Sequence, residues 1–223
     1  MDDPISLPDL RALGDLETFV WRARRVDPDG ACRLVATGDV LAVYASPVHG
    51  GGGPTVLALR VLALAQPAHL DVTVSLAGLL DRFPSARAAS EPGVAAAGPV
   101  PVRVPADHVT VSWAGVSPPR AGWDAVGLLD PRQLRQLAAD GVREIADGVP
   151  AGAGAAAVAR LRGQVWGRAL SADLPDVPAG IAFAADALGF LDDAEPVALY
   201  RLGPWARTTT RRGHVLARRP ALL

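Results

Sequence analysis

The sequence predicts an α+β protein, in which an antiparallel β-sheet is covered by helices and a helical second half ends in a small three-stranded β unit. Three observations lead to this fold class. Strand-like segments in the first half alternate apolar and polar residues and are joined by short turns, which favours antiparallel neighbours. Helix start and stop signals dominate residues 130–191. Short strand-like segments return after residue 197.

The first predicted element is an amphipathic helix over residues 6–26. Ser6 is its expected N-cap, and Pro8 falls in the first turn. Leucine, valine and aromatic residues then recur at helical spacing, and the turn residues 27–30 end the helix. The apolar stripe predicts a helix that packs on the core.

Strands are predicted after this helix. Residues 33–36 and 40–44 resemble two strands joined by a turn at 37–39. Four consecutive glycines, residues 50–53, precede another predicted strand over 55–62. Because the glycine run leads into a strand and the chain contains no lysine, we interpret it as a flexible hairpin tip rather than a phosphate-binding loop.

The middle of the chain carries weaker signals. A strand over 70–74 is followed by a short helix over 76–83. Segment 84–99 is rich in Ser, Ala, Gly and Pro, and residues 100–105 suit only an edge strand because their prolines cannot donate to a ladder. We expect a single domain over 1–223, and any subdomain break should fall within 84–99.

The second half contains the clearest helix start. Asp130 is the expected N-cap, Pro131 occupies the first helical position, Gln133 completes a capping box, and Gly148 ends the helix. Two further helices and three short strands are predicted over 155–166, 179–191, 197–202, 205–210 and 214–218. The helix over 179–191 is apolar nearly all round, which predicts that it is buried.

Several kinds of chemistry are excluded by residue types that the chain lacks. Without lysine there is no Schiff-base or P-loop lysine, and with Cys32 as the single cysteine there is no intrachain disulfide. The four histidines lack metal-ligand spacing. Neither a G-x-S-x-G elbow nor a dinucleotide fingerprint is present. We therefore expect no metal and no cofactor.

The termini and hydropathy point to a soluble cytoplasmic protein. The N-terminus begins Met-Asp-Asp-Pro and lacks the apolar core of a signal peptide. The longest uncharged run, residues 40–59, contains four glycines and two prolines, so it does not suit a membrane helix. We expect no membrane contact.

Two tryptophans bracket the segment 111–123. The predicted strand through Trp113 ends near Gly115, two prolines stiffen the following loop, and Trp123 closes it with Arg120 near its apex. In the interpretation that we favour, both indoles hold the loop on the core. In the alternative, Arg120 and the indole faces form a site for a small molecule or anion.

The C-terminal region is basic. Residues 201–223 carry six arginines and no acidic residue, whereas residues 1–200 hold the other 16 arginines and all 23 acidic residues. The arginines either pair with the acidic body, which we favour, or face an anionic partner. The candidate binding residues are Trp113, Ser117, Arg120, Trp123, Trp166, Arg168, Trp205, Arg207, Arg211, Arg212 and His214.

Three runs of residues carry a resemblance that spans nearly the whole chain: W-A-G-V-S-P-P-R at 113–120, V-W-G-R at 165–168 and R-G-H-V-L at 212–216. On these runs the sequence resembles a group of uncharacterised proteins from high-GC actinobacteria. The resemblance implies no known activity, cofactor or catalytic residue.

The leading hypothesis is a non-catalytic cytoplasmic binding or interaction protein that uses the 113–123 loop and the arginine-rich end. Its partner would be an anionic small molecule or a protein, and the chain could form a homo-oligomer. The alternative is a hydrolase or transferase acting on an anionic small molecule, with Arg120, Arg168, Arg207 and His214 in its site. Nucleic-acid binding is a weaker third hypothesis.

Overall fold

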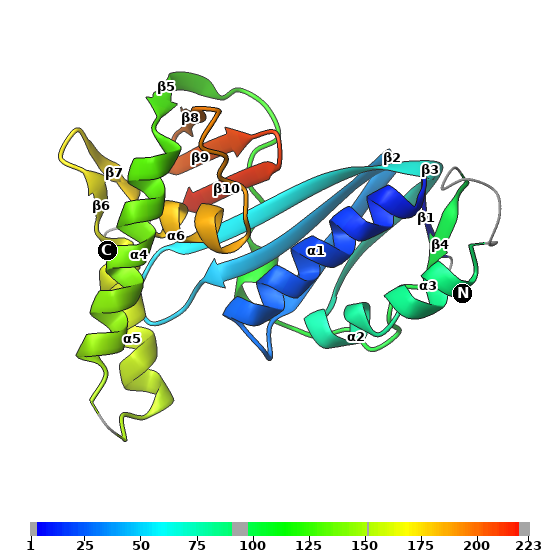
Figure 1. Ribbon diagram of the computed structural model, residues 1–223, viewed down its shortest axis with the longest axis horizontal. Coiled ribbons are helices and arrows are strands. Elements are labelled where there is room, and N and C mark those ends of the chain that lie inside the picture. Colours follow the sequence, from blue (N-terminus) through cyan, green and yellow to red (C-terminus); the bar gives the residue numbers. More distant parts are fainter. Residues whose placement is uncertain (1–3, 91–97, 151, 219–223) are drawn as a thin grey trace. The chain divides into compact units, whose positions relative to one another are not determined.

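The computed structural model describes residues 4–90, 98–150 and 152–218 (Figure 1). The predicted α+β class is confirmed. The chain divides into two compact units, Met1–Ala45 with Leu59–Gly115 and Ser46–Ala58 with Val116–Leu223. The described part of segment 84–99 lies inside the first unit. Our expectation of one domain stays a prediction.

The first unit begins with a short strand rather than a helix. β1 (Ile5–Leu7) pairs antiparallel with β4 (Val100–Val102), which places Ser6 opposite Pro101. The predicted N-cap at Ser6 is therefore wrong, because this pairing keeps its backbone extended. Helix α1 (Leu10–Val26) starts instead at Asp9, whose carboxylate accepts a 2.7 Å hydrogen bond from the Ala12 N–H.

Two long strands, β2 (Ala31–Val48) and β3 (Thr55–Ser75), contribute residues to both units. The predicted turn at 37–39 is wrong, because β2 continues through Gly38, which has a φ of +63°. Glycine adopts that left-handed conformation without strain, so the strand absorbs the irregularity and continues. The two strands predicted at 55–62 and 70–74 are likewise one strand.

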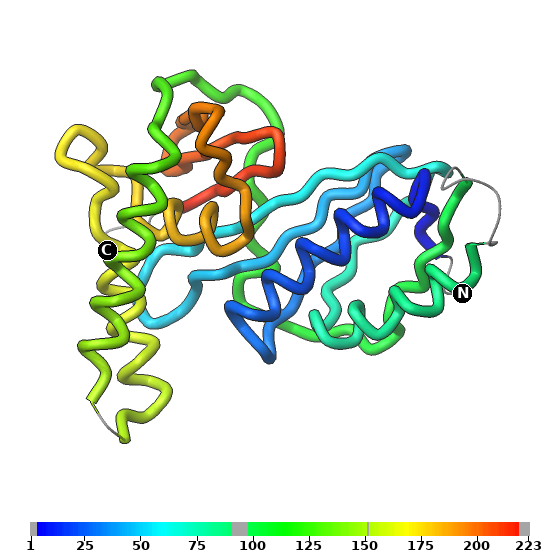
Figure 2. Tube along the Cα trace, in the orientation of Figure 1, coloured from blue at the N-terminus to red at the C-terminus, as the bar shows by residue number. Residues whose placement is uncertain are grey.

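Short helices complete the first unit (Figure 2). α2 (Leu76–Leu80) is capped by Ser75, and α3 (Phe83–Ala88) follows it; α1 packs against both. The predicted strand through Trp113 is wrong: His108 makes an isolated bridge to Val74, and η1 (Ser112–Gly115) is a 3-10 helix that buries Trp113.

A six-stranded sheet has the strand order β2-β3-β10-β9-β8-β5, and the second unit holds its last four strands with residues 46–48 of β2 and 55–58 of β3. These four strands are β5 (Asp124–Leu129), β8 (Val197–Leu202), β9 (Trp205–Thr210) and β10 (Gly213–Arg218). The predicted three-stranded end, β8 to β10, is confirmed. The sequence predicts no strand at β5, whose side chains are exposed except for the half-buried Leu129 and show no inward-facing alternation.

Three helices and a hairpin complete the second unit. They are α4 (Pro131–Gly148), α5 (Ala155–Gly167), α6 (Gly180–Ala187) and the hairpin of β6 (Ala169–Ser171) with β7 (Leu174–Pro178). Asp130 caps α4 as predicted, accepting a hydrogen bond from the Arg132 N–H. α6 packs against both α4 and β10 and is buried as expected, although it ends at Ala187 rather than at residue 191.

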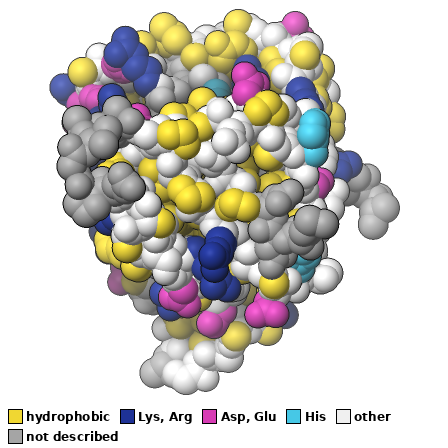
Figure 3. Space-filling model, turned by 90° about the vertical axis from the view of Figure 1, so that its right-hand side faces the viewer, with side chains coloured by type: hydrophobic (Ala, Val, Ile, Leu, Met, Phe, Trp, Pro, Cys, Tyr) yellow, Lys and Arg dark blue, Asp and Glu magenta, His cyan; other side chains and the backbone are white. Residues whose placement is uncertain are grey.

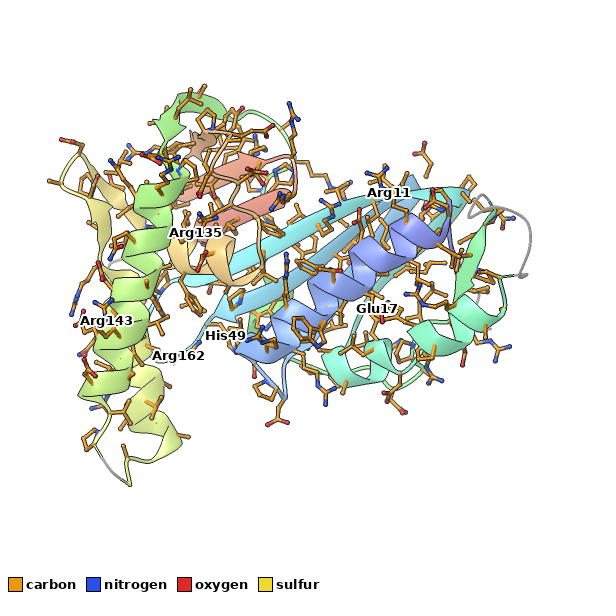
Figure 4. The ribbon with its side chains drawn as sticks, in the orientation of Figure 1. Arg11, Glu17, His49, Arg135, Arg143 and Arg162 are labelled. Atoms are coloured by element: carbon orange, nitrogen blue, oxygen red, sulfur yellow. The ribbon has the colours of Figure 1, made fainter. Side chains whose placement is uncertain are left out.

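The glycine run at the β2–β3 turn packs against α5 within the second unit. A Cβ added to Gly53 would lie 2.7 Å from Gly163 Cα, so the two backbones approach too closely for a side chain. Gly51 has a φ of +62° and faces the carbonyl of Ala159. Arg162, labelled in Figure 4, donates to the Pro47 carbonyl beside this turn. The predicted hairpin tip is present, and its glycines allow close backbone contact.

Within the described residues, no helix is both long enough and apolar enough to cross a membrane.

Candidate functional site

The β8–β9 hairpin places an arginine beside two aromatic rings. A two-residue turn, Gly203-Pro204, sets the register so that Tyr200 lies directly opposite Arg207. Trp123 immediately precedes β5, the neighbour of β8. The Arg207 Cζ atom is 4.5 Å from the centroid of the Trp123 ring and 4.5 Å from that of Tyr200. We call these three residues the aromatic–arginine stack.

The stack lies on the face of the sheet opposite Leu199 and Thr208. Leu199 and Thr208, the neighbours of Tyr200 and Arg207 along the strands, are almost fully buried. Side chains alternate between the two faces of a strand, so Tyr200 and Arg207 point away from the face that Leu199 and Thr208 share. The buried face is the one on which Gly213 meets Phe190, next to α6.

Arg207 makes no hydrogen bond to any residue that the structure describes. Its Nε atom is buried without a partner, and the residue as a whole is half-buried. Burial lowers the pKa of the Arg207 guanidinium from its ordinary value, but arginine remains charged at neutral pH. The stack therefore holds a positive charge that has no carboxylate partner among the described residues.

A second arginine in β8 is also short of acceptors. Arg201 has its Nε and one terminal nitrogen buried, with no partner among the described residues. It lies opposite Asp124 in the sheet register and follows Tyr200 in the chain, so it projects to the other face from the stack. The two arginines therefore do not form one site.

The 113–123 loop is divided between the two units. Trp113 belongs to the first unit, while Ser117, Arg120 and Trp123 belong to the second. The Trp123 indole N–H donates a 3.1 Å hydrogen bond to the Pro119 carbonyl, which ties the proline segment to the stack. Ser117 and Arg120 are exposed. Trp123 thus holds the second part of the loop, whereas the bracket of two indoles stays a prediction because Trp113 belongs to the other unit.

Arg211 and Arg212 pair with carboxylates, as our favoured interpretation of the basic end predicts, and so does Arg168 outside that end. Arg211 lies 2.9 Å from Glu195, and Arg212 lies 2.7 Å from Asp192. Arg168 makes a two-pronged contact of 2.6 Å with Glu144. Arg135, labelled in Figure 4, reaches the same acidic segment from α4 and pairs with Asp186 and Asp193.

The remaining candidates are engaged in packing or local hydrogen bonds. Trp166 is 1% exposed and stacks on Phe183 with a centroid distance of 4.5 Å, and Trp205 is also buried. The His214 ring lies 3.0 Å from the Thr209 hydroxyl. Among the described residues, no group of three or more His, Cys, Asp or Glu side chains could hold a metal ion.

Tyr200 is the stack residue that sequence analysis missed. A usable signal was present: the two-residue turn at Gly203-Pro204 fixes which residues face each other across the hairpin, and Tyr200 is the one opposite Arg207. Selecting candidates by residue type alone found the arginine and the indole, but not the ring between their strands.

Each unit also contains a hollow away from the stack. In the first unit, a hollow of about 730 Å³ is bordered by His69 and His108. Figure 3 shows hydrophobic side chains across the middle of one face of the molecule, with charged side chains of both signs around them. In the second unit, a hollow of about 350 Å³ is lined mainly by leucines of α4 and of the β6–β7 hairpin. Neither hollow contains an arginine in its lining.

Comparison with known families finds two matches. Residues 1–106 match a family model described as a domain of unknown function (DUF8010), and residues 118–222 match another described in the same words (DUF8185). No curated protein matches the chain. Residues 46–58, which complete the second unit, lie inside the first of these two matches.

Proposed function

We propose that this protein is a non-catalytic binding protein that holds an anionic partner at the aromatic–arginine stack. The observation that carries the proposal is the Arg207 guanidinium, which lies 4.5 Å from two rings and has no carboxylate partner among the described residues. The Ser117–Trp123 loop and the C-terminal strands would form the surrounding surface.

The energetic argument rests on unused donors. Charge-assisted hydrogen bonds to an incoming anion are about twice as strong as neutral ones. Stacking on aromatic rings also fixes the plane of the guanidinium before a ligand arrives, which reduces the entropy lost on binding.

The arrangement supports binding more than catalysis. The enzymatic alternative requires Arg168 and His214 alongside Arg207, but Arg168 is held by Glu144 and the His214 ring lies beside the Thr209 hydroxyl. A guanidinium cannot act as a general base at neutral pH because it stays protonated. Anion capture is the task to which Arg207 is suited.

A cytoplasmic location and a source among high-GC actinobacteria belong to the same proposal. They are supported by a single, buried cysteine, by the absence of lysine beside abundant alanine, glycine and proline, and by the three sequence runs quoted above.

Tryptophan fluorescence offers a direct test, because Trp123 contacts Arg207. Wild type, Arg207→Gln and Arg211→Gln are titrated with inorganic phosphate, citrate and poly-glutamate, each against sodium chloride at matched ionic strength. We expect a saturable change in wild type that is lost in Arg207→Gln and kept in Arg211→Gln, whose arginine is exposed and paired with Glu195. A wild-type protein that responds to none of these anions would refute the proposal.

A further inference from the structure

From the open edge of the six-stranded sheet we propose that two copies of this chain pair through β5 and form an antiparallel, two-fold symmetric dimer. This inference goes beyond the proposed function and does not depend on it. It follows from the unpaired edge of β5, from the exposed apolar side chains of that strand, and from the unpaired charges at its two ends.

The outer edge of β5 is open. β5 is the last strand in the sheet order and pairs only with β8 among the described strands. Its outer edge therefore presents backbone N–H and C=O groups without a partner strand. Natural edge strands are usually protected by charges, prolines or bulges. β5 has one bulge between Ala125 and Gly127, but no charge and no proline from Ala125 to Leu129.

The apolar side chains of β5 lie in solvent. Leu128 is 68% exposed, the highest value among the exposed large hydrophobic side chains that the structure describes, and Val126 is 43% exposed. Pairing at this edge would satisfy backbone groups and remove apolar surface from water in one step. Because the bulge interrupts the first half of the strand, the regular part is Gly127–Leu129, and Leu128 is its centre.

The charges at the two ends of β5 make the strand complementary to itself. Asp124 opens the strand, and Arg132 follows its end by three residues. Both are exposed, and neither side chain makes an ion pair or hydrogen bond with a described residue. In an antiparallel pair centred on Leu128, Asp124 of one copy faces Arg132 of the other, because each is four positions from the centre.

This charge pattern selects a second copy as the occupant of the edge. A different protein would have to offer a base to Asp124 and an acid to Arg132 at the same separation, whereas a second copy offers both. Asp130 is still extended before α4 begins, and the long arginine side chain covers the offset introduced by the first helical turn. A two-fold axis through Leu128 then forms the ion pair twice.

The same register fills the leucine-lined hollow of the second unit. That hollow, of about 350 Å³, is bordered by Leu129 and Asp130 at the end of β5. With Leu128 facing its own counterpart on the two-fold axis, Val126 of one copy lies opposite Asp130 of the other, next to the hollow. The two exposed apolar side chains of β5 would thus both be covered in the dimer.

The oligomeric state of the full chain is the first test. In analytical ultracentrifugation we expect wild type to move from monomer to dimer as its concentration rises. Leu128→Lys places two like charges on the two-fold axis and should raise the dimer dissociation constant at least about tenfold. Val61→Lys, which replaces an exposed valine of the first unit, should leave it unchanged. A wild-type chain that stays monomeric at every concentration overturns the proposal.

A charge exchange tests the register. Asp124→Arg and Arg132→Asp each bring like charges together across the two-fold axis, so each variant should dimerise more weakly than wild type. The double variant restores opposite charges and should recover dimerisation, a result that a misfolded variant cannot produce. A double variant that dimerises no better than the two single variants would contradict the pairing.

A cysteine at the two-fold axis gives a direct readout. Facing residues of an antiparallel pair have Cβ atoms about 4.5–5.5 Å apart, near the spacing that a disulfide requires. Mild oxidation of Leu128→Cys should give a covalent dimer on a non-reducing gel, whereas Val61→Cys should not. Cys32 does not compete, because it is fully buried and burial raises the pKa of its thiol to about 12.

Equal cross-linking of the two cysteine variants would refute pairing through β5. The anion titrations compare Arg207→Gln and Arg211→Gln with wild type and change no residue of β5. The dimer and the anion site can therefore fail separately.

Discussion

Arg33 in the first unit and Arg207 in the second are both partly buried strand arginines, yet their surroundings are opposite. Arg33 donates to both oxygens of Asp71, at 2.7 and 2.6 Å, and to the Ala114 carbonyl at 2.7 Å. Hydrogen bonding to Asp71 raises the pKa of Arg33. Arg207 has aromatic rings in place of acceptors, and burial lowers its pKa.

The difference separates a structural arginine from a receptive one. Arg33 donates hydrogen bonds within the fold, and these bonds join β2 to β3 and to the end of η1. Arg207 is positioned by its contacts with two aromatic rings and makes no hydrogen bond to a described residue. The same side chain thus stabilises one unit and, in our proposal, serves a ligand in the other.

Replacing the structural arginine should have the largest effect on stability. Arg33→Met keeps the aliphatic stem but removes the donors to Asp71 and to the Ala114 carbonyl. Hydrogen bonds to charged groups typically contribute about 1.5–3 kcal/mol, and we expect a loss of about 2 kcal/mol in the free energy of unfolding. Urea denaturation followed by circular dichroism measures it. A loss below about 0.5 kcal/mol would mean that Arg33 is not a structural arginine.

The Asp71 carboxylate should make that stabilisation depend on pH. Hydrogen bonding from Arg33 lowers the pKa of Asp71 below its ordinary value of 3.8. The pair therefore contributes stability at pH values above the unfolded pKa, and the contribution is lost as the pH falls through the folded pKa. We expect Asp71→Asn to be less stable than wild type at pH 7.

That gap in stability should close on acidification toward pH 2, because wild type then loses the same ion pair. Denaturation midpoints at pH 7, 4 and 2 give the comparison. The side chain of Asp71 is 53% exposed, so solvent screens the pair and the effect should be smaller than that of Arg33→Met. A gap that stays constant over this range would contradict the assignment.

The smallest effect on stability is expected for the receptive arginine. Arg207→Met removes a cation–π contribution of roughly 1 kcal/mol, but it also removes a buried N–H that lacks an acceptor, which offsets that loss. We expect the free energy of unfolding to stay within about 1 kcal/mol of wild type in the same urea assay, while anion binding disappears. A loss above about 2 kcal/mol would show that Arg207 is structural like Arg33.

Local signals in the sequence predicted those elements whose ends are set by their own residues. Asp130 and Pro131 marked the start of α4, and the turn at Gly203-Pro204 separated β8 from β9. The failures came from long-range pairing. Ser6 is a good cap by type but lies in a strand because of Val100–Val102, and Gly38 looks like a turn but is accommodated within β2.

The candidate site was predicted in part for the same reason. Trp123 and Arg207 were selected by residue type, and their contact joins positions 84 residues apart in the chain. No local pattern reports such a contact. Nor could composition distinguish Arg207 from Arg211 and Arg212, because the difference depends on whether Glu195 or Asp192 lies within reach.

The contact between Gly53 and Gly163 predicts how a truncated form of the protein would behave. A fragment that starts at Val116 would lack Ser46–Ala58, which carries residues 46–48 of β2 and 55–58 of β3, the two strands that follow β10 in the sheet order. Such a fragment should expose the unpaired edge of β10 and part of the surface of α5, and should therefore precipitate or self-associate. Residues 46–58 fused to the N-terminus of this fragment should restore a protein that stays in solution.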